Sequence, residues 1–287
     1  MKNTILILAI IIASIFISCE KDATVTPPKT DKQVVVSSYI SPNDDYVTIY
    51  LNWSMPLYNG TSIYQNTRIE NATVTITDGA NVVTIPYTEN SQDLTAGKYA
   101  IATTSYPIQA GKTYSLAIQI PGYDKTITAT IYIPMPIDAH TITITKGVDN
   151  SYRIKGNITD NSTESTYGVV IKGGYDYYPT SVNNLDYRDF DYYPNNFELR
   201  TSKQYDVTYN KYMTGLENNE TTIIDSLKVL TYHLSKDYYN FAKNNLVAVE
   251  SDSNPFAEPY TIYTNIQNGL GIFAGYSTKQ EILVDVP

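Results

Sequence analysis

The segment TYSLAIQI, residues 113–120, alternates apolar and polar side chains. Its larger apolar residues recur at every second position: Tyr114, Leu116, Ile118 and Ile120. In an extended chain this spacing places them on one face, while the residues between them lie on the other. The segment therefore predicts a β-strand with one face in a core.

Short segments of the same kind, separated by turn signals such as Asp78-Gly79 and Pro121-Gly122, surround it. They are residues 34–40, 46–54, 72–77, 81–87, 98–103 and 126–133. About seven strands at this spacing predict an immunoglobulin-like or fibronectin-like β-sandwich. We place this sandwich at residues 33–136 and expect Trp53 to be its central core aromatic.

Two prolines in the stretch IPMPI, residues 133–137, end this series, because proline cannot lie inside a central strand. We predict a domain boundary after residue 136 and a second, β-rich domain at 137–287. Its expected strands are 141–145, 152–158, 167–172, 205–212, 222–234, 260–267 and 270–277. The pair Asn268-Gly269 predicts a tight hairpin turn between the last two. The fold class is therefore mainly β.

One segment of the second domain has helical rather than strand periodicity. Tyr238, Phe241, Ala242 and Leu246 recur at intervals of one turn, and Ser235 is suited to cap the helix N-terminus. We predict one helix at residues 235–250.

Composition limits the classes of function. The chain has 20 Lys and Arg against 29 Asp and Glu, and 28 Tyr against 6 Phe and 1 Trp. Removal of a signal peptide containing Lys2 leaves 19 basic residues against 29 acidic ones, a net charge of −10. An acidic protein of this kind is not expected to bind nucleic acid, whose phosphates would repel it.

The chain has a single cysteine, Cys19, at the end of an apolar run. The uncharged run at residues 5–18 is too short to span a bilayer and is typical of a signal peptide, here residues 1–18. Ser18 before the cysteine resembles the lipobox of bacterial lipoproteins. We therefore expect lipid attachment at Cys19, a membrane anchor that does not span the bilayer, and a flexible tether at 19–32.

A C-terminal motif resembles that of domain-of-unknown-function family 4249, lipoproteins of the Bacteroidota. It comprises Asn254, Pro255, Phe256, Glu258 and Pro259, followed by Gly269 and Gly271 in NGLGIF. The motif is first of all structural, since prolines fix an extended connector and glycines relieve crowding in a hairpin.

The family resemblance also implies a location and a partner. Members are often encoded beside TonB-dependent outer-membrane transporters, which implies an accessory role in the cell envelope. Glu20 and Asp22 resemble the acidic signal that sends such lipoproteins to the cell exterior. Asp225-Ser226-Leu227 resembles a short O-glycosylation sequence, and whether Ser226 is modified stays open.

Catalytic motifs are missing from the sequence. The two histidines, His140 and His233, lie in strand-like segments, and no HExxH, GxSxG or phosphate-loop pattern occurs. The acidic residues Asp186, Asp189 and Asp191 lack the spacing of a calcium loop. We expect neither an enzyme nor a bound metal or cofactor.

An aromatic insertion at residues 174–200 is the strongest indication of binding. Its aromatic residues are Tyr175, Tyr177, Tyr178, Tyr187, Phe190, Tyr192 and Tyr193. Tyrosine suits protein interfaces and stacking on sugars, but the rings could equally fill a small core of their own.

The function expected from these features is an outer-membrane lipoprotein, facing the cell exterior, that assists a TonB-dependent transporter in nutrient uptake. Its ligand could be a glycan, a peptide or another nutrient. One alternative is a structural or adhesive surface lipoprotein. A second is a glycan-acting enzyme, which would carry paired carboxylates in a cleft.

Overall fold

Strands dominate the part of the chain that the structure describes. The computed structural model describes residues 31–55, 67–88, 97–147, 151–162, 166–175, 189–190, 198–210, 212–214, 221–223, 226–252 and 261–284. Its elements belong to one compact unit, residues 32–55 and 61–287. The mainly β prediction is confirmed.

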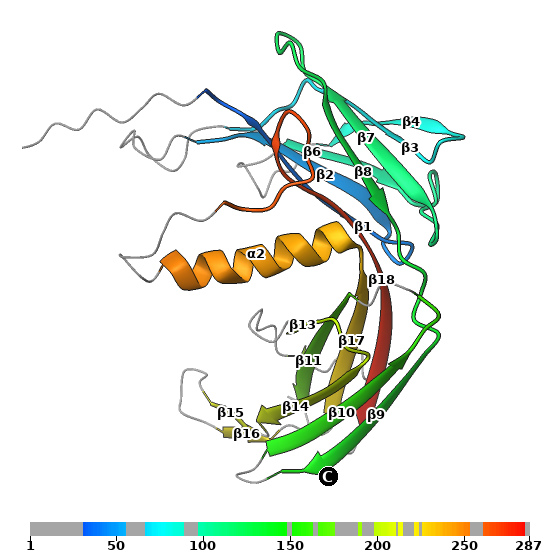
Figure 1. Cartoon of the computed structure of the whole chain (residues 1–287), viewed down its shortest axis with the longest axis vertical. Helices are drawn as coiled ribbons and strands as arrows, with labels where there is room; N and C mark the ends of the chain where they lie inside the picture. The colour runs from blue at the N-terminus through cyan, green and yellow to red at the C-terminus, as the bar shows by residue number, and fades with distance from the viewer. Residues whose placement is uncertain are drawn as a thin grey trace, which may run out of the picture. The chain divides into compact units, whose positions relative to one another are not determined.

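The first part of this unit is the predicted sandwich (Figure 1). One layer holds β1 (Val34–Ile40), β2 (Tyr46–Trp53), β6 (Gly97–Ala102) and β5 (Tyr87–Thr88). The facing layer holds β4 (Val82–Ile85), β3 (Thr73–Thr77), β7 (Thr113–Gln119) and β8 (Ile127–Tyr132). In both β1 and β7 every second residue is buried, as the alternation of side chains predicts.

The first layer continues into the second half of the chain through the last strand. β18 (Leu270–Val284) runs parallel to β1 and antiparallel to β17 (Ser226–Leu234), as Figure 1 shows. Next to β17 lies β11 (Tyr167–Tyr175), which pairs with β12 (Asp189–Phe190) and β13 (Glu198–Arg200). The two predicted domains therefore share one sheet, while the predicted boundary after residue 136 stays a prediction.

A separate three-stranded sheet lies against β11 and β17. Its strand order is β14 (Gln204–Asn210), β10 (Ser151–Thr159) and β9 (Ala139–Lys146). A further, two-stranded sheet consists of β15 (Tyr212–Thr214) and β16 (Thr221–Ile223). The core here contains Tyr152, Ile154, Val229 and Leu227. The sandwich core instead includes Phe273 of β18.

These two cores lie on the same face of the shared sheet. Phe273, Gly275 and Ser277 alternate along one face of β18, and Ser277 is paired with His233, which shares its face with Val229. The facing layer of the sandwich and the three-stranded sheet thus cover one face of a common sheet at two places.

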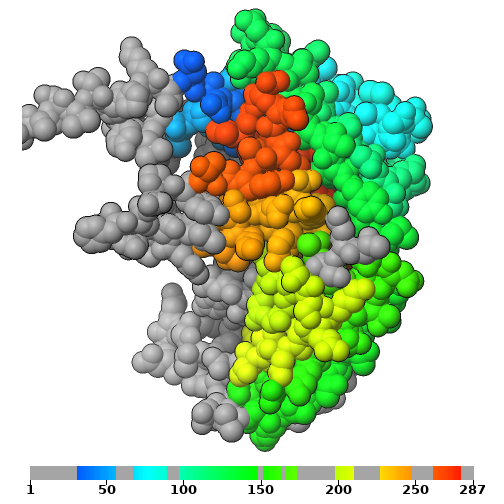
Figure 2. Space-filling view, in the orientation of Figure 1, coloured from blue at the N-terminus to red at the C-terminus, as the bar shows by residue number. Residues whose placement is uncertain are grey.

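The helix α2 (Lys236–Asp252) lies on the opposite face, beginning one residue after the predicted Ser235. The Ser235 hydroxyl accepts the backbone N–H of Tyr238 at 3.2 Å and that of Gly275 at 3.3 Å. The first bond is the predicted N-cap. In the space-filling view the helix (orange) lies at the surface between the segment 261–270 and the yellow strands (Figure 2).

Two sequence expectations differ from the structure. Trp53 is only half-buried at the end of β2, in edge contact with Tyr123, whereas Tyr99, Tyr114 and Phe273 are fully buried in the sandwich core. Residues 261–266 form no strand, and only Gln267 makes an isolated bridge, to Thr128.

A side chain takes the place of the expected hairpin strand before β18. The Asn265 amide accepts the Phe273 N–H at 3.0 Å and donates to the Phe273 carbonyl at 2.7 Å. Asn268 has a φ of 61°, so the Asn-Gly pair does form a turn, but it leads directly into β18.

Candidate functional site

A cleft of about 610 Å³ lies where β8, β10 and β17 end. Its walls come from the connector after β8, the residues after β10 and the start of α2: Tyr132, Pro134, Met135, Pro136, Asp138, Asp160, Asn161, Ser162, His233, Leu234, Ser235, Lys236 and Asp237. The volume falls within the range of small-molecule sites.

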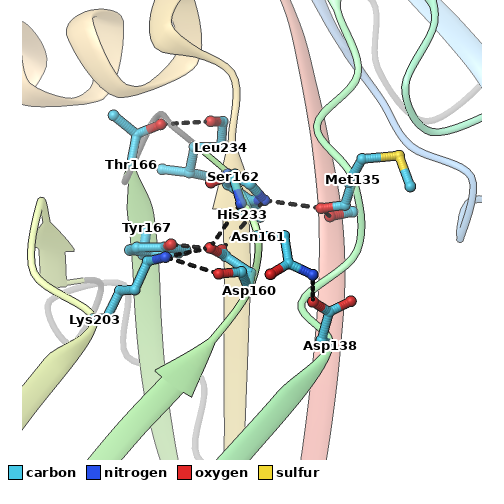
Figure 3. Close-up of polar contacts among 11 residues, drawn as sticks. Met135, Asp138, Asp160, Asn161, Ser162, Thr166, Tyr167, Lys203, His233 and Leu234 are labelled. Atoms are coloured by element: carbon cyan, nitrogen blue, oxygen red, sulfur yellow. Dashed lines mark hydrogen bonds and ion pairs between the residues drawn. The ribbon is translucent and has the colours of Figure 1, made fainter.

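The polar floor of the cleft centres on Asp160, whose side chain is only 3% exposed. Lys203 Nζ lies 2.7 Å from Asp160 Oδ1, and the Tyr167 hydroxyl donates to Asp160 Oδ2 at 2.5 Å (Figure 3). The backbone N–H of Ser162 donates to Oδ1 at 3.2 Å. Both carboxylate oxygens are therefore hydrogen-bonded, as a buried charge requires.

These bonds determine the protonation state of Asp160. Burial favours the neutral acid, but the hydrogen bonds from Lys203 and Tyr167 outweigh it and lower the pKa of Asp160. The carboxylate is therefore ionised at neutral pH, and Lys203 compensates its charge.

His233 is 3% exposed and lies beside Asp160 at the end of β17. Its Nδ1 lies 2.8 Å from the carbonyl oxygen of Met135, and a carbonyl can only accept, so Nδ1 carries the proton. In the neutral ring Nε2 is then an acceptor, and it lies 3.4 Å from the Ser162 hydroxyl. Asp160 Oδ2 is 3.9 Å from Nδ1, too far to be its hydrogen-bond partner.

The upper wall of the cleft is apolar. Tyr132 is 49% exposed and Met135 is 54% exposed, and Pro134 and Pro136 flank Met135. The backbone of Met135 is nevertheless fixed, because its carbonyl also accepts the Ser277 hydroxyl at 3.1 Å. The cleft thus combines a rigid connector with apolar side chains that a ligand could cover.

The charges that line the cleft are mainly negative. Asp160 is compensated by Lys203, which leaves Asp138 and Asp237 against Lys236. Asp138 accepts the Asn161 amide at 3.1 Å (Figure 3). A ligand that is neutral or carries a cationic group is therefore favoured over an anion.

The cleft has the size and lining to bind a small molecule, and one pair of its side chains, Ser162 and His233, could also react with it. A serine hydroxyl facing the acceptor nitrogen of an oriented histidine is the arrangement of an activated nucleophile. Here the orienting group is the Met135 carbonyl rather than a carboxylate. The 3.4 Å separation of Ser162 and His233 is long for the hydrogen bond between such a pair.

Most of the residues singled out in the sequence, for lipid attachment, for binding or as a structural motif, lie outside the described residues. These are Cys19, Tyr177, Tyr178, Tyr187, Tyr192, Tyr193, Asn254, Pro255, Phe256, Glu258 and Pro259. Tyr175 ends β11, where it is paired with Asp189, and Phe190 lies in β12 opposite Gly174. Ser226 begins β17.

The motif glycines Gly269 and Gly271, at the start of β18, pack against the backbone of β1. A methyl group on Gly271, whose φ is +99°, would lie 1.9 Å from the carbonyl oxygen of Val36. One on Gly269 would lie 2.8 Å from that of Val34. The close approach that excludes a side chain is therefore that of two parallel strands, β1 and β18.

Sequence reasoning missed the cleft residues. Asp160, Tyr167, Lys203 and His233 are separated by up to 73 positions and come from four different strands or their ends. In the sequence, His233 is only a histidine in a strand-like segment. No periodicity or spacing in the chain indicates that these four side chains meet.

In the described part of the chain, no helix is long and apolar enough to cross a membrane. The same residues contain no group of three or more His, Cys, Asp or Glu side chains arranged to hold a metal ion.

Comparison with known proteins gives a family and a distant structural likeness. The family described as Domain of unknown function (DUF4249) matches residues 20–282. No curated protein matches the chain. Among solved structures, the chicken CNTN1 FN1–FN3 domains match with 13% identity and a TM-score of 0.32, over 69% of this chain. The match spans 56% of that structure's own length.

Proposed function

We propose, on the premise that this chain belongs to the DUF4249 family, that it is a lipid-anchored binding protein of the outer membrane. It faces the cell exterior, is held by lipid on Cys19, and assists a TonB-dependent transporter in nutrient uptake. The signal peptide and lipobox-like sequence support the anchor, and the family resemblance supports the partner.

The cleft at the ends of β8, β10 and β17 is the observation that carries the binding role. Its floor is polar and already hydrogen-bonded, so a ligand need not rearrange it, and its upper wall offers exposed apolar surface. Preformed sites of this composition bind small molecules. The negative lining favours a nutrient with an apolar part and an amino group, such as a short peptide.

Co-purification tests the partnership. The native chain is expected to recover a TonB-dependent transporter from outer membranes solubilised in mild detergent. The Cys19→Ala variant is expected to leave the envelope fraction and to recover no transporter. Recovery of no transporter with the native chain, or unchanged sedimentation of Cys19→Ala with envelopes, would contradict the proposal.

A matched pair of variants tests the cleft. Met135 (54% exposed) lines the cleft, while Leu246 (51% exposed) lies on α2 and does not line it. Native mass spectrometry of the full chain with a library of tri- to pentapeptides is the assay. Met135→Gln should weaken retention about tenfold, the equivalent of about 1.4 kcal/mol of lost apolar contact. Leu246→Gln should not. Equal retention by both variants, or none by the native chain, would exclude this cleft as a peptide site.

A second candidate function rests on Ser162 and His233. If His233 accepts the Ser162 proton, the hydroxyl could attack an ester carbonyl in the cleft, forming an acyl-serine and releasing the alcohol. A fluorophosphonate probe should then label Ser162 in the folded chain and not in Ser162→Ala. An unlabelled Ser162 would remove this candidate function. The glycan-acting enzyme stays a separate proposal, because two carboxylates, Asp138 and Asp237, also line the cleft.

A further inference from the structure

The strand β9 (Ala139–Lys146) is one edge of the three-stranded sheet, as Figure 1 shows. It pairs with β10 at every residue from 139 to 146, so no bulge interrupts it. Within the described residues, no strand or bridge pairs with its other side. A strand in this position presents a row of backbone N–H and C=O groups with which another strand can pair.

β9 lacks the features that usually protect an edge. It contains no proline, and its one charged residue at neutral pH, Lys146, is the last of the strand. The opposite edge of the same sheet, β14, instead carries Asp206 within it. Proline, bulges and charges are the means by which proteins prevent edge strands from pairing. β9 can therefore accept a further strand more readily than β14.

The side chains that face the core show that cover is missing at this edge. Ile142 and Ile144 pack on the core beneath the sheet but are only partly buried. Tyr152 and Ile154, which face the same core from the neighbouring strand β10, are completely buried. A strand added beside β9 would remove more of the two isoleucine side chains from water, which is favourable.

The sequence of β9 is complementary to a second copy of itself. Residues 141–145 read Thr-Ile-Thr-Ile-Thr, which is the same in both directions. Two such strands can pair antiparallel about a two-fold axis at Thr143. Thr141 is then opposite Thr145 of the second copy, and the isoleucines are opposite each other. Because opposite residues of an antiparallel pair lie on one face, the isoleucines meet on the core side and the threonines on the outer side.

The charges near this edge agree with such a pair. Lys146 lies at one end of β9, so antiparallel pairing keeps the two Lys146 side chains at opposite ends of the joined strands. On the neighbouring strand β10, Arg153 lies 2.7 Å and Lys155 4.0 Å from Asp206, which compensates their charge. No two lysines therefore lie opposite each other across the joined strands.

We propose that two copies of this chain associate through β9, in an antiparallel pair centred on Thr143 that joins the two three-stranded sheets. The association goes beyond the binding role of the cleft and does not depend on it. Asp138, which lines the cleft, directly precedes β9, so the two clefts lie at opposite ends of the joined strands. Two eight-residue edges bury less surface than a stable interface, so the dimer is weak in solution.

Cysteine cross-linking of the full chain tests the register. In a Cys19→Ala background, which removes the chain's own thiol, Thr143→Cys should form an intermolecular disulfide under mild oxidation. The residue lies opposite itself, with about 5 Å between the Cα atoms, which a disulfide can span. Thr145→Cys alone should not cross-link, since its two copies are about 14 Å apart, but a mixture of Thr145→Cys and Thr141→Cys should. No cross-link from Thr143→Cys, or an equal yield from Thr145→Cys alone, would overturn the proposal.

Sedimentation velocity supplies a readout that needs no cross-link. The Cys19→Ala chain, at about 10 µM to about 1 mM, should show a dimer whose share rises with concentration. Thr143→Lys places two ammonium groups opposite each other and should weaken association at least about tenfold. Thr84→Lys changes an exposed threonine on another edge strand, β4, and should leave association unchanged.

Far-UV circular dichroism should be the same for both lysine variants, because both threonines are exposed. Equal association of the two variants would overturn the proposal. A chain that stays monomeric at every concentration would also overturn it, and would leave this edge to a strand of another protein.

Discussion

Replacement of Lys203 by methionine should expose how much the buried ion pair contributes to stability. The substitution keeps the unbranched apolar stem and removes the ammonium group, which contacts Asp160 Oδ1 at 2.7 Å and the Asp160 carbonyl at 2.9 Å. Asp160 would keep the bonds from Tyr167 and the Ser162 N–H but lose its compensating charge.

The magnitude follows from the burial of the two partners. Breaking a fully buried ion pair costs about 3–5 kcal/mol, but Lys203 is 34% exposed, so water can replace part of the lost contact. We therefore expect the free energy of unfolding to fall by about 2 kcal/mol at neutral pH. Urea unfolding of the full chain, followed by far-UV circular dichroism, measures this difference.

The loss should depend on pH in a defined direction. The folded-state pKa of Asp160 is lowered, so its contribution is complete above the unfolded value of about 3.9 and is lost as the pH falls through the folded value. In Lys203→Met the pKa of Asp160 should rise, because burial still favours the neutral acid and the bond from Lys203 is lost while that from Tyr167 remains, so protonation relieves the buried charge. The stability difference between variant and native chain should therefore be largest near pH 7 and should narrow as the pH falls through about 4.

A matched control separates the buried pair from an ordinary surface pair. Arg153 contacts Asp206 at 2.7 Å, but both side chains are well exposed, at 55% and 41%. Arg153→Met should cost only a small part of the loss seen in Lys203→Met. Equal losses in the two variants, or a Lys203→Met deficit that does not change with pH, would refute the assignment of Asp160 as a buried, paired anion.

Three further substitutions test the contacts of β18 and α2. Gly271→Ala should prevent native folding or lower the urea midpoint severely, since the new methyl group would meet the Val36 carbonyl at 1.9 Å; an unchanged midpoint would contradict the parallel pairing. Asn265→Ala should cost about 1–3 kcal/mol in the same assay, because it leaves the buried N–H and carbonyl of Phe273 without partners. Ser235→Ala should cost about 1 kcal/mol and reduce amide-exchange protection in the first turn of α2, and Ser235→Thr, which can still cap the helix, should lose much less.

Local patterns in the chain were enough to predict most elements. The alternation in residues 113–120 gave a strand at Thr113–Gln119, and the segment opening at Ser235 gave a helix at Lys236–Asp252. Period and capping are properties of neighbouring residues, so they can be read without knowing what the element contacts. The prediction failed at residues 261–266, where the Asn265 side chain rather than a neighbouring strand satisfies the backbone of Phe273.

The sequence alone therefore determined the kind of fold, with its short half-buried strands and one helix, and the acidic charge of the chain. Only the tertiary structure decided that β18 joins β1 to β17, that two covering layers lie on one face of the shared sheet, and that Asp160, His233 and Lys203 meet beside a cleft. The physical reason is the range of the interactions. Strand periodicity comes from adjacent residues, whereas a buried ion pair and a pocket floor require side chains that are distant in the chain. In the sequence, each of those side chains looks like any other polar residue near a strand end.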